Sequence, residues 1–141
     1  MKHAVTVTVT PLVRFVEWLF GPLAPGIDLI LCLFAASWGS LMIARPQIFD
    51  RGAFVGMGWL PDVTWIAFFA ILTVLHGLGV FCCYLRWIRV TACLLSAWIW
   101  ISVAVSFAKI EVTTGVLTYA IIGGAALCGA LYLSGQPRKA V

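Results

Sequence analysis

Long apolar runs dominate the chain, and the stretches between them hold most of its charged residues. Four of these runs are long enough to cross a bilayer, since a transmembrane helix needs about 20 predominantly apolar residues. They cover residues 27–44, 63–85, 87–107 and 114–133. The hydropathy pattern therefore predicts four transmembrane helices.

The connections between these runs predict how the helices are arranged. The connection at 45–62 is long and rich in Gly, Pro and aromatic residues, whereas Arg86 and Arg89 mark a tight basic hairpin and a short polar turn follows residue 107. Short connections place consecutive helices side by side in antiparallel order. Residues 24–135 are thus predicted to form an all-α integral membrane protein, with four transmembrane helices in an antiparallel bundle.

The flanking segments have patterns of their own. Within residues 1–11, Val and Thr alternate from 5 to 10, and the segment lacks the features of a removable signal peptide. We therefore expect an extended tail that would pair only with a neighbouring subunit. Residues 12–22 predict a short amphipathic helix at the membrane interface. The alternative is that this segment extends the first transmembrane helix through a proline kink. Residues 136–141 form a basic C-terminal tail.

Composition supports membrane insertion. Of 141 residues, 63% are hydrophobic and 10% are charged, and a soluble domain of this size could not hide so much apolar surface. The net charge of +4 is explained by cations between the hydrophobic runs, so no nucleic-acid partner is expected. The expected partner is the lipid bilayer.

The distribution of the nine Lys and Arg residues predicts the orientation. Four predicted spans place both termini and the second connection on one side, with six cations against three on the other. Cytoplasmic segments carry the excess of Lys and Arg, so both termini are predicted in the cytoplasm, in a bacterial inner membrane. Lipid headgroup contacts are predicted for Arg86, Arg89, Arg138 and Lys139.

Small residues recur at a spacing of four, which lets helix backbones approach closely in a membrane. These packing residues include Ala36, Ser40, Gly124, Cys128 and Gly129. The last predicted helix has more of this surface than one neighbour requires. Contact between subunits of a homo-oligomer and tight packing inside one bundle both explain it.

His76 is the principal candidate for chemistry because an ionisable residue deep in a membrane span is costly. Its candidate roles are a proton relay, a pore-lining group or a metal ligand. The alternative is a neutral imidazole that forms a packing hydrogen bond with Ser96, Ser102 or Thr73. Asp28, near the start of the first span, is expected to cap that helix, and the alternative is that it faces a polar cavity.

The remaining candidates indicate no cofactor and no enzyme. The adjacent Cys82 and Cys83 lie in an apolar run, and Cys83 is two helical turns from His76, too far to share a metal ion. Gly77 and Gly79 are expected to permit close helix contact. The sequence contains no nucleotide-binding loop, zinc-protease motif, haem-attachment motif or recognisable nucleophile triad.

Several segments together resemble small four-span membrane proteins encoded by tailed bacteriophages of the podovirus type, which are holin-like or of unassigned function. The segments are SWGSLMIARPQIFD, GWLPDVTWIAF, LRWIR, LLSAWIW and TTGVLTY. The resemblance covers about residues 24 to 135. It implies a phage-encoded protein of the inner membrane or the virion, and it assigns no catalytic residue.

Three functional interpretations remain open. The first is a holin-like, pore-forming homo-oligomer. The second is a structural membrane subunit that binds a protein partner through the 45–62 connection, where Phe49, Phe54, Met57 and Trp59 would be exposed. The third is a small channel or transporter that uses His76.

Overall fold

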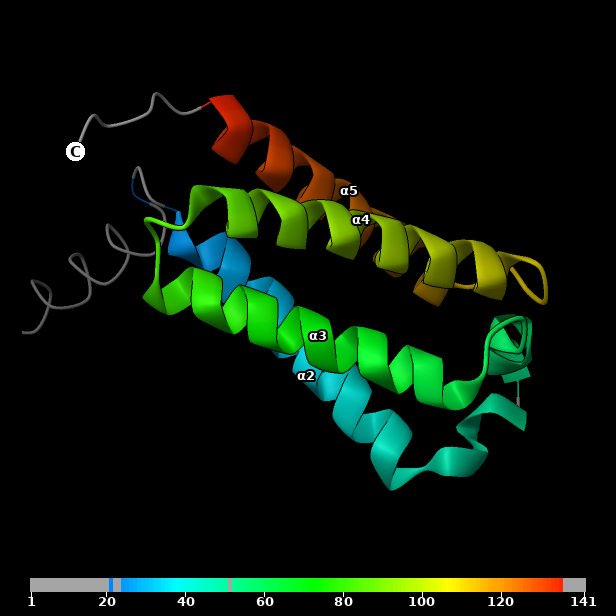
Figure 1. Cartoon of the computed structure of the whole chain (residues 1–141). Coiled ribbons are helices and arrows are strands. Elements are labelled where there is room, and N and C mark those ends of the chain that lie inside the picture. Colours follow the sequence, from blue (N-terminus) through cyan, green and yellow to red (C-terminus); the bar gives the residue numbers. More distant parts are fainter. Residues whose placement is uncertain (1–20, 22–23, 51, 136–141) are drawn as a thin grey trace, which may run out of the picture.

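Four long helices run up and down in the computed structural model, which describes residues 21, 24–50 and 52–135 (Figure 1). They are α2 (Pro25–Ala44), α3 (Asp62–Phe81), α4 (Arg86–Ala108) and α5 (Thr114–Gly135). No strand occurs in this part of the chain. The predicted all-α fold with four helices long and apolar enough to span a membrane is confirmed. The N-terminal tail, the predicted interfacial helix except Gly21, and the basic tail lie outside the described residues.

The helix boundaries differ from the hydropathy pattern by a few residues. Helix α2 begins two residues earlier than predicted, at Pro25. Proline is well suited to the first turn, because backbone N–H groups there have no partner within the helix and the N–H that proline lacks costs no hydrogen bond. Helix α3 ends at Phe81, four residues before the end of the apolar run. The remaining four residues form the turn into α4, in which the Leu85 N–H donates to the Cys82 carbonyl.

The bundle consists of two helical hairpins. Helix α2 packs along α3 and helix α4 packs along α5, while the two hairpins meet mainly where α3 and the connection between α2 and α3 approach α4. Gly123 brings α5 close to α4, because a Cβ atom there would lie 2.8 Å from Ile101 Cγ1. Gly39 similarly lies against Phe69 of α3.

Aromatic side chains fill one half of the space between the hairpins. The indole of Trp38 meets Trp100 edge to face at 5.7 Å and Tyr119 at 5.0 Å between ring centroids. Phe69, tilted against Trp38, and Phe107, edge-on to Tyr119, complete this aromatic cluster. Aromatic pairs of this kind add about 0.5–1.5 kcal/mol each beyond burial. The helices therefore contact one another here through large side chains rather than through close backbones.

The connection between α2 and α3 folds back onto the bundle as two short 3-10 helices, η1 (Pro46–Asp50) and η2 (Gly52–Met57). Gly56 lies directly on α4, since a Cβ atom there would sit 2.0 Å from the Ser106 carbonyl oxygen. The Trp65 indole donates to the Met57 carbonyl at 3.0 Å. The connection is thus part of the core at this end.

This packing corrects the expected docking surface of the 45–62 connection. Phe49 and Met57 are buried, and Phe54 is half-buried against the aromatic cluster. Of the four hydrophobic residues expected at the surface, only Trp59 is exposed, and its indole donates to the Ser106 hydroxyl at 3.0 Å. The hydrophobic residues of the connection serve mainly to close the bundle.

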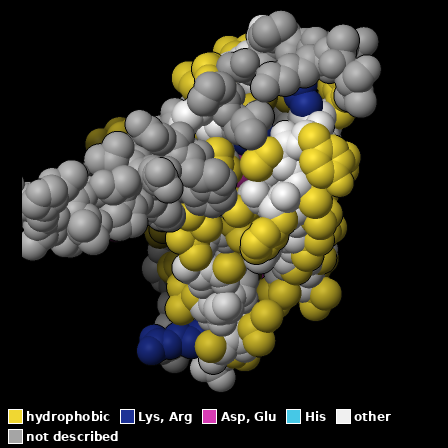
Figure 2. Space-filling model, turned by 90° about the vertical axis from the view of Figure 1, so that its left-hand side faces the viewer, with side chains coloured by type: hydrophobic (Ala, Val, Ile, Leu, Met, Phe, Trp, Pro, Cys, Tyr) yellow, Lys and Arg dark blue, Asp and Glu magenta, His cyan; other side chains and the backbone are white. Residues whose placement is uncertain are grey.

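Apolar side chains also cover the outside of the helices. Large exposed hydrophobic residues occur on all four, for example Ile43, Val74, Trp98 and Leu131. Figure 2 shows hydrophobic side chains over most of the described surface at the left-hand side of Figure 1, with few charged groups between them. A soluble protein rarely exposes so large an apolar surface, so this surface faces lipid.

Candidate functional site: a buried charged network between the hairpins

Asp28 is the centre of a polar network in the other half of the space between the hairpins. It lies in the first turn of α2, where a helix-capping role was expected, but its side chain is completely buried. Helix α2 has no side-chain cap hydrogen bond. The capping prediction for Asp28 is therefore wrong, and the carboxylate instead binds groups from α3 and α4.

His76 of α3 bridges Asp28 and Ser96. Its Nδ1 lies 2.9 Å from Asp28 Oδ1, and its Nε2 lies 2.7 Å from Ser96 Oγ. All three side chains are completely buried. Of the three hydroxyl partners considered for this imidazole, Ser96 is the one bonded, whereas the Thr73 hydroxyl donates to the Phe69 carbonyl of its own helix.

Arg89 of α4 supplies the positive charge. Its Nε donates to Asp28 Oδ2 at 2.6 Å and its Nη2 donates to the Ala24 carbonyl at 3.0 Å. The side chain is 2% exposed, so Arg89 does not contact lipid headgroups as its position in the basic hairpin had predicted. This correction has a physical reason. A buried carboxylate needs a cationic partner, and Arg89 lies at the same level of the bundle as Asp28.

Gly79 makes room for the carboxylate. A Cβ atom at this position would lie 2.7 Å from Asp28 Oδ1 and 3.2 Å from Arg89 Cγ. Gly77, on the same helix, has only Cys32 Sγ nearby, at 4.0 Å. Of the two glycines in the LHGLG stretch, Gly79 is therefore the one that the network requires.

The network extends from one end of the bundle toward its middle. Arg89 is the fourth residue of α4, and Ser96 lies two turns further, about 10 Å along the axis. Beyond Ser96 on the same face, Trp100 belongs to the aromatic cluster. Helix α5 closes the side of the network at Gly129, where a Cβ atom would lie 3.7 Å from Cys93 Sγ and 3.0 Å from Ile27 Cγ2. The polar path therefore ends at the aromatic cluster.

The hydrogen bonds define the tautomer of His76. Asp28 as a carboxylate only accepts, so Nδ1 carries the proton and donates to Oδ1. In the neutral ring, Nε2 then accepts from the Ser96 hydroxyl. With one carboxylate and one guanidinium, the network has no net charge in this state. A proton added at Nε2 would give it a net charge of +1 and would force Ser96 to accept instead of donate.

Asp28, His76 and Cys93 also offer three metal-ligand atoms that lie within 4.8 Å of one another. However, Arg89 occupies one oxygen of Asp28, and both ring nitrogens of His76 already have hydrogen-bond partners. A divalent cation would have to replace these bonds next to a guanidinium. The contacts satisfy the carboxylate with Arg89 and His76, so we do not assign a metal to this cluster.

The order Asp28–His76–Ser96 matches the connectivity of a hydrolytic triad, a constellation that the sequence had not indicated. A triad also needs donors for the oxyanion that forms during acyl transfer. Ser96 lies within α4, where backbone N–H groups donate to carbonyls of the preceding turn. The arrangement fits the binding of a proton better than nucleophilic attack by Ser96.

Of the other predicted residues that the structure describes, Gly129 borders the network at Cys93 and the rest take no part in it. Arg86 donates to the Ser134 carbonyl at the end of α5, and Arg138 and Lys139 lie outside the described residues. Gly129 is buried. Ala36 is half-buried, Ser40 and Cys128 are exposed, and a Cβ atom on Gly124 would meet no atom within 4 Å. Three of the expected packing positions therefore face away from the bundle.

Comparison with protein-family models, with curated proteins and with solved structures found no match to the chain. The fold itself defines the class: an all-α membrane protein with four candidate spans. Within this class, the chain is distinguished by a buried Asp–His–Arg–Ser network that joins three of its helices.

Proposed function

We propose that the protein is a small channel or transporter whose opening is controlled by proton binding at His76. The observation that carries this proposal is that both ring nitrogens of a fully buried histidine are bonded, one to an ionic pair and the other to a hydroxyl. Histidine is the side chain best suited to change its charge near physiological pH.

The charge balance of the network provides the mechanism. The polar and titratable groups around His76 are Asp28 from α2, and Arg89, Cys93 and Ser96 from α4, while α5 contains no charged residue. Cys32 of α2 donates to the Thr73 carbonyl, one helical turn from His76. Protonation of the ring changes a neutral network into one with a net charge of +1. A net charge without water is strongly disfavoured in a membrane interior, so the protonated form favours entry of water.

Water can enter where the hairpins are joined least. The α2–α3 and α4–α5 contacts are extensive, whereas those between the hairpins are few. Separation of the hairpins would hydrate the network and then reach the aromatic cluster around Trp38 and Trp100. In this mechanism the aromatic cluster is the gate, and the His76 network is the proton-sensitive element that opens it.

Proteoliposomes test this proposal. Purified protein is reconstituted with a pH-sensitive dye inside, and proton or ion flux is recorded as the external pH is lowered. We expect acid-stimulated flux in the wild type and its loss in His76→Gln, which keeps the hydrogen-bonding capacity but cannot become charged. His3→Gln, which changes the only other histidine, is the matched control. Equal flux in wild type and H76Q would refute the proposal.

A holin-like, phage-encoded pore is the second candidate. It is supported by a specific feature of α5: Gly124 and Cys128 form a row of small residues in which a Cβ atom on Gly124 would meet no atom within 4 Å of the described chain and Cys128 is exposed. Such a row permits close contact with a second copy. Gly124→Leu should then delay or abolish depolarisation of expressing bacteria, while Leu117→Phe, at another exposed position of α5, should not. Expression without depolarisation would exclude this candidate.

We place the protein in the bacterial inner membrane, with the Arg86 end of the bundle in the cytoplasm. Support comes from the excess of Lys and Arg in the termini and second connection. A fluorescent protein that folds only in the cytoplasm, fused after Val141, should be bright. Fluorescence only for a fusion at the opposite end of the bundle would reverse the orientation. Stoichiometric copurification with a soluble complex would instead favour the structural-subunit interpretation.

A further inference from the structure

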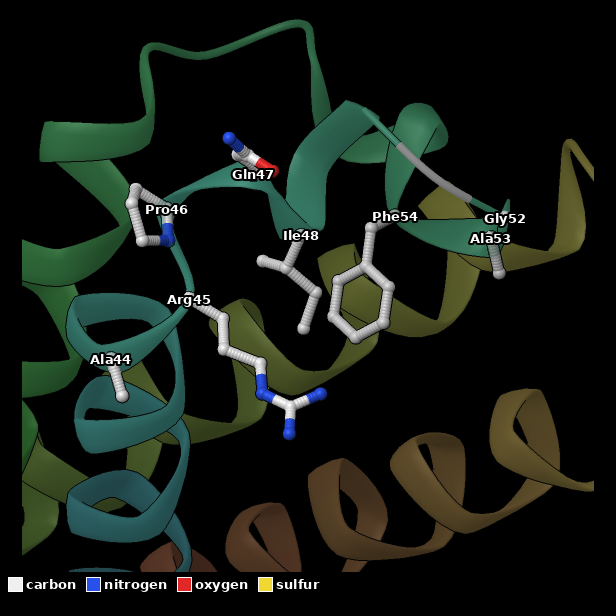
Figure 3. A pocket seen from close by; sticks show the side chains of 8 residues that line it. All are labelled: Ala44, Arg45, Pro46, Gln47, Ile48, Gly52, Ala53 and Phe54. Carbon is white, nitrogen blue, oxygen red and sulfur yellow. The ribbon is translucent and has the colours of Figure 1, made fainter.

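A pocket opens at the end of the bundle opposite the His76 network. It lies where α2 ends, has a volume of about 600 Å³ and is lined by residues 44–48 and 52–54 (Figure 3). This volume is within the range of about 300–1,000 Å³ that is typical of sites for small ligands. The pocket is thus large enough for part of an amphiphilic molecule.

The lining of the pocket combines one cation with apolar walls. Among the described residues that line it, Arg45 is the only charged one. In Figure 3 the side chains of Arg45, Ile48 and Phe54 extend into the same space, between the connection and α5. Within the described residues, the Arg45 guanidinium has neither an ion-pair partner nor a side-chain hydrogen bond. The complementary ligand therefore carries one anionic group next to an apolar part.

The position of the pocket identifies the source of such a ligand. Arg45 follows directly after the last residue of a candidate membrane span, so its guanidinium lies at the boundary between the hydrocarbon region and the headgroups. Phospholipids place their phosphate groups at this depth and their acyl chains immediately below it. Arginine is well suited to phosphate because its planar guanidinium can donate two parallel hydrogen bonds.

We propose that this pocket binds an anionic phospholipid of the phosphatidylglycerol type. Arg45 pairs with the phosphate, and the beginning of one acyl chain packs against Ile48 and Phe54. A bound lipid would contact both α2 and the η1–η2 connection, and it would therefore stabilise the end of the bundle that holds the aromatic cluster. The site is independent of His76, since helix α2 separates it from Asp28 by about 25 Å.

Native mass spectrometry of the purified full-length protein tests the assignment. The protein is released from detergent with phosphatidylglycerol or phosphatidylcholine, and the lipid retained is measured as a function of lipid concentration. We expect preferential retention of phosphatidylglycerol by the wild type. Arg45→Gln should weaken it about tenfold, the effect expected from loss of one charge-assisted contact, and Arg45→Glu should weaken it further.

Lys109→Gln is the matched control, because Lys109 is an exposed cation at the same end of the bundle but does not line the pocket. This variant should retain phosphatidylglycerol like the wild type. The site would be overturned if R45Q and K109Q weakened retention equally, or if R45Q had no effect. Retention of both lipids to the same extent by the wild type would overturn the preference for an anionic lipid. Neither result would alter the His76 flux experiment.

Discussion

Replacing Gly79 with alanine tests whether the carboxylate of Asp28 is fixed in the network. The new Cβ atom would lie 2.7 Å from Asp28 Oδ1, and an ordinary contact requires 3.4 Å, so the carboxylate would have to move by about 0.7 Å. A shift of this size lengthens the 2.9 Å bond to His76 or the 2.6 Å bond to Arg89 beyond a good hydrogen bond. The substitution therefore acts on the ionic pair although it removes no polar atom.

The expected loss follows from two opposing effects. Breaking a buried ion pair costs about 3–5 kcal/mol, whereas Gly→Ala in a helix gains up to about 1 kcal/mol. We therefore expect G79A to lower the free energy of unfolding by about 2–4 kcal/mol. Gly77→Ala is the control, because its Cβ atom meets only Cys32 Sγ at 4.0 Å and should be neutral or slightly stabilising.

The measurement is reversible unfolding in mixed detergent micelles by increasing fractions of dodecyl sulfate, followed by circular dichroism and by tryptophan fluorescence. Both glycines lie in α3 only two residues apart, so the pair separates the effect of the network from the general effect of alanine in this helix. The reasoning is refuted if G79A is as stable as G77A.

Three further substitutions test other contacts by the same unfolding measurement. Asp28→Asn should lower the free energy of unfolding by about 3–5 kcal/mol, because Arg89 stays buried without a counter-ion. Adding Arg89→Met to this variant should recover part of the lost stability. No recovery would argue against the ion pair. Gly123→Ala should destabilise by about 1–3 kcal/mol through overpacking against Ile101, whereas Gly124→Ala should be tolerated, and equal effects would contradict the α4–α5 packing. Trp59→Phe should cost about 1 kcal/mol through loss of the bond to Ser106, whereas Trp98→Phe, which has no such bond, should cost less.

The number, type and order of the helices could be predicted from hydropathy because a membrane span needs an uninterrupted apolar run. Exact ends could not, since they depend on local events such as the turn of residues 82–85. The compact connection was also missed. Its length and its aromatic residues suggest an exposed docking surface, but Gly56 permits backbone contact with α4, and this contact exists only in the folded bundle.

The candidate site was only partly predictable. His76 was identified because an imidazole inside an apolar run is expensive without a partner, and Ser96 was among its expected partners. Asp28 and Arg89 were assigned to a helix cap and to the headgroups because each lies near the end of a predicted span. One signal for the pair was present: both charges fall within an apolar helix rather than outside it, and such charges normally pair with each other. The two residues are 61 positions apart in the sequence, so the spacing gave no indication that they pair.

Nitrogen-15 NMR of the His76 ring, in the full-length protein in lipid bilayers, reports its protonation state atom by atom. At neutral to alkaline pH the ring should be neutral, with the proton on Nδ1 toward Asp28 and an unprotonated Nε2 that accepts from Ser96. On acidification both nitrogens should become protonated over the pH range in which flux appears in proteoliposomes. A ring that stays neutral while flux rises, or a proton on Nε2 in the neutral state, would contradict the proton-controlled network.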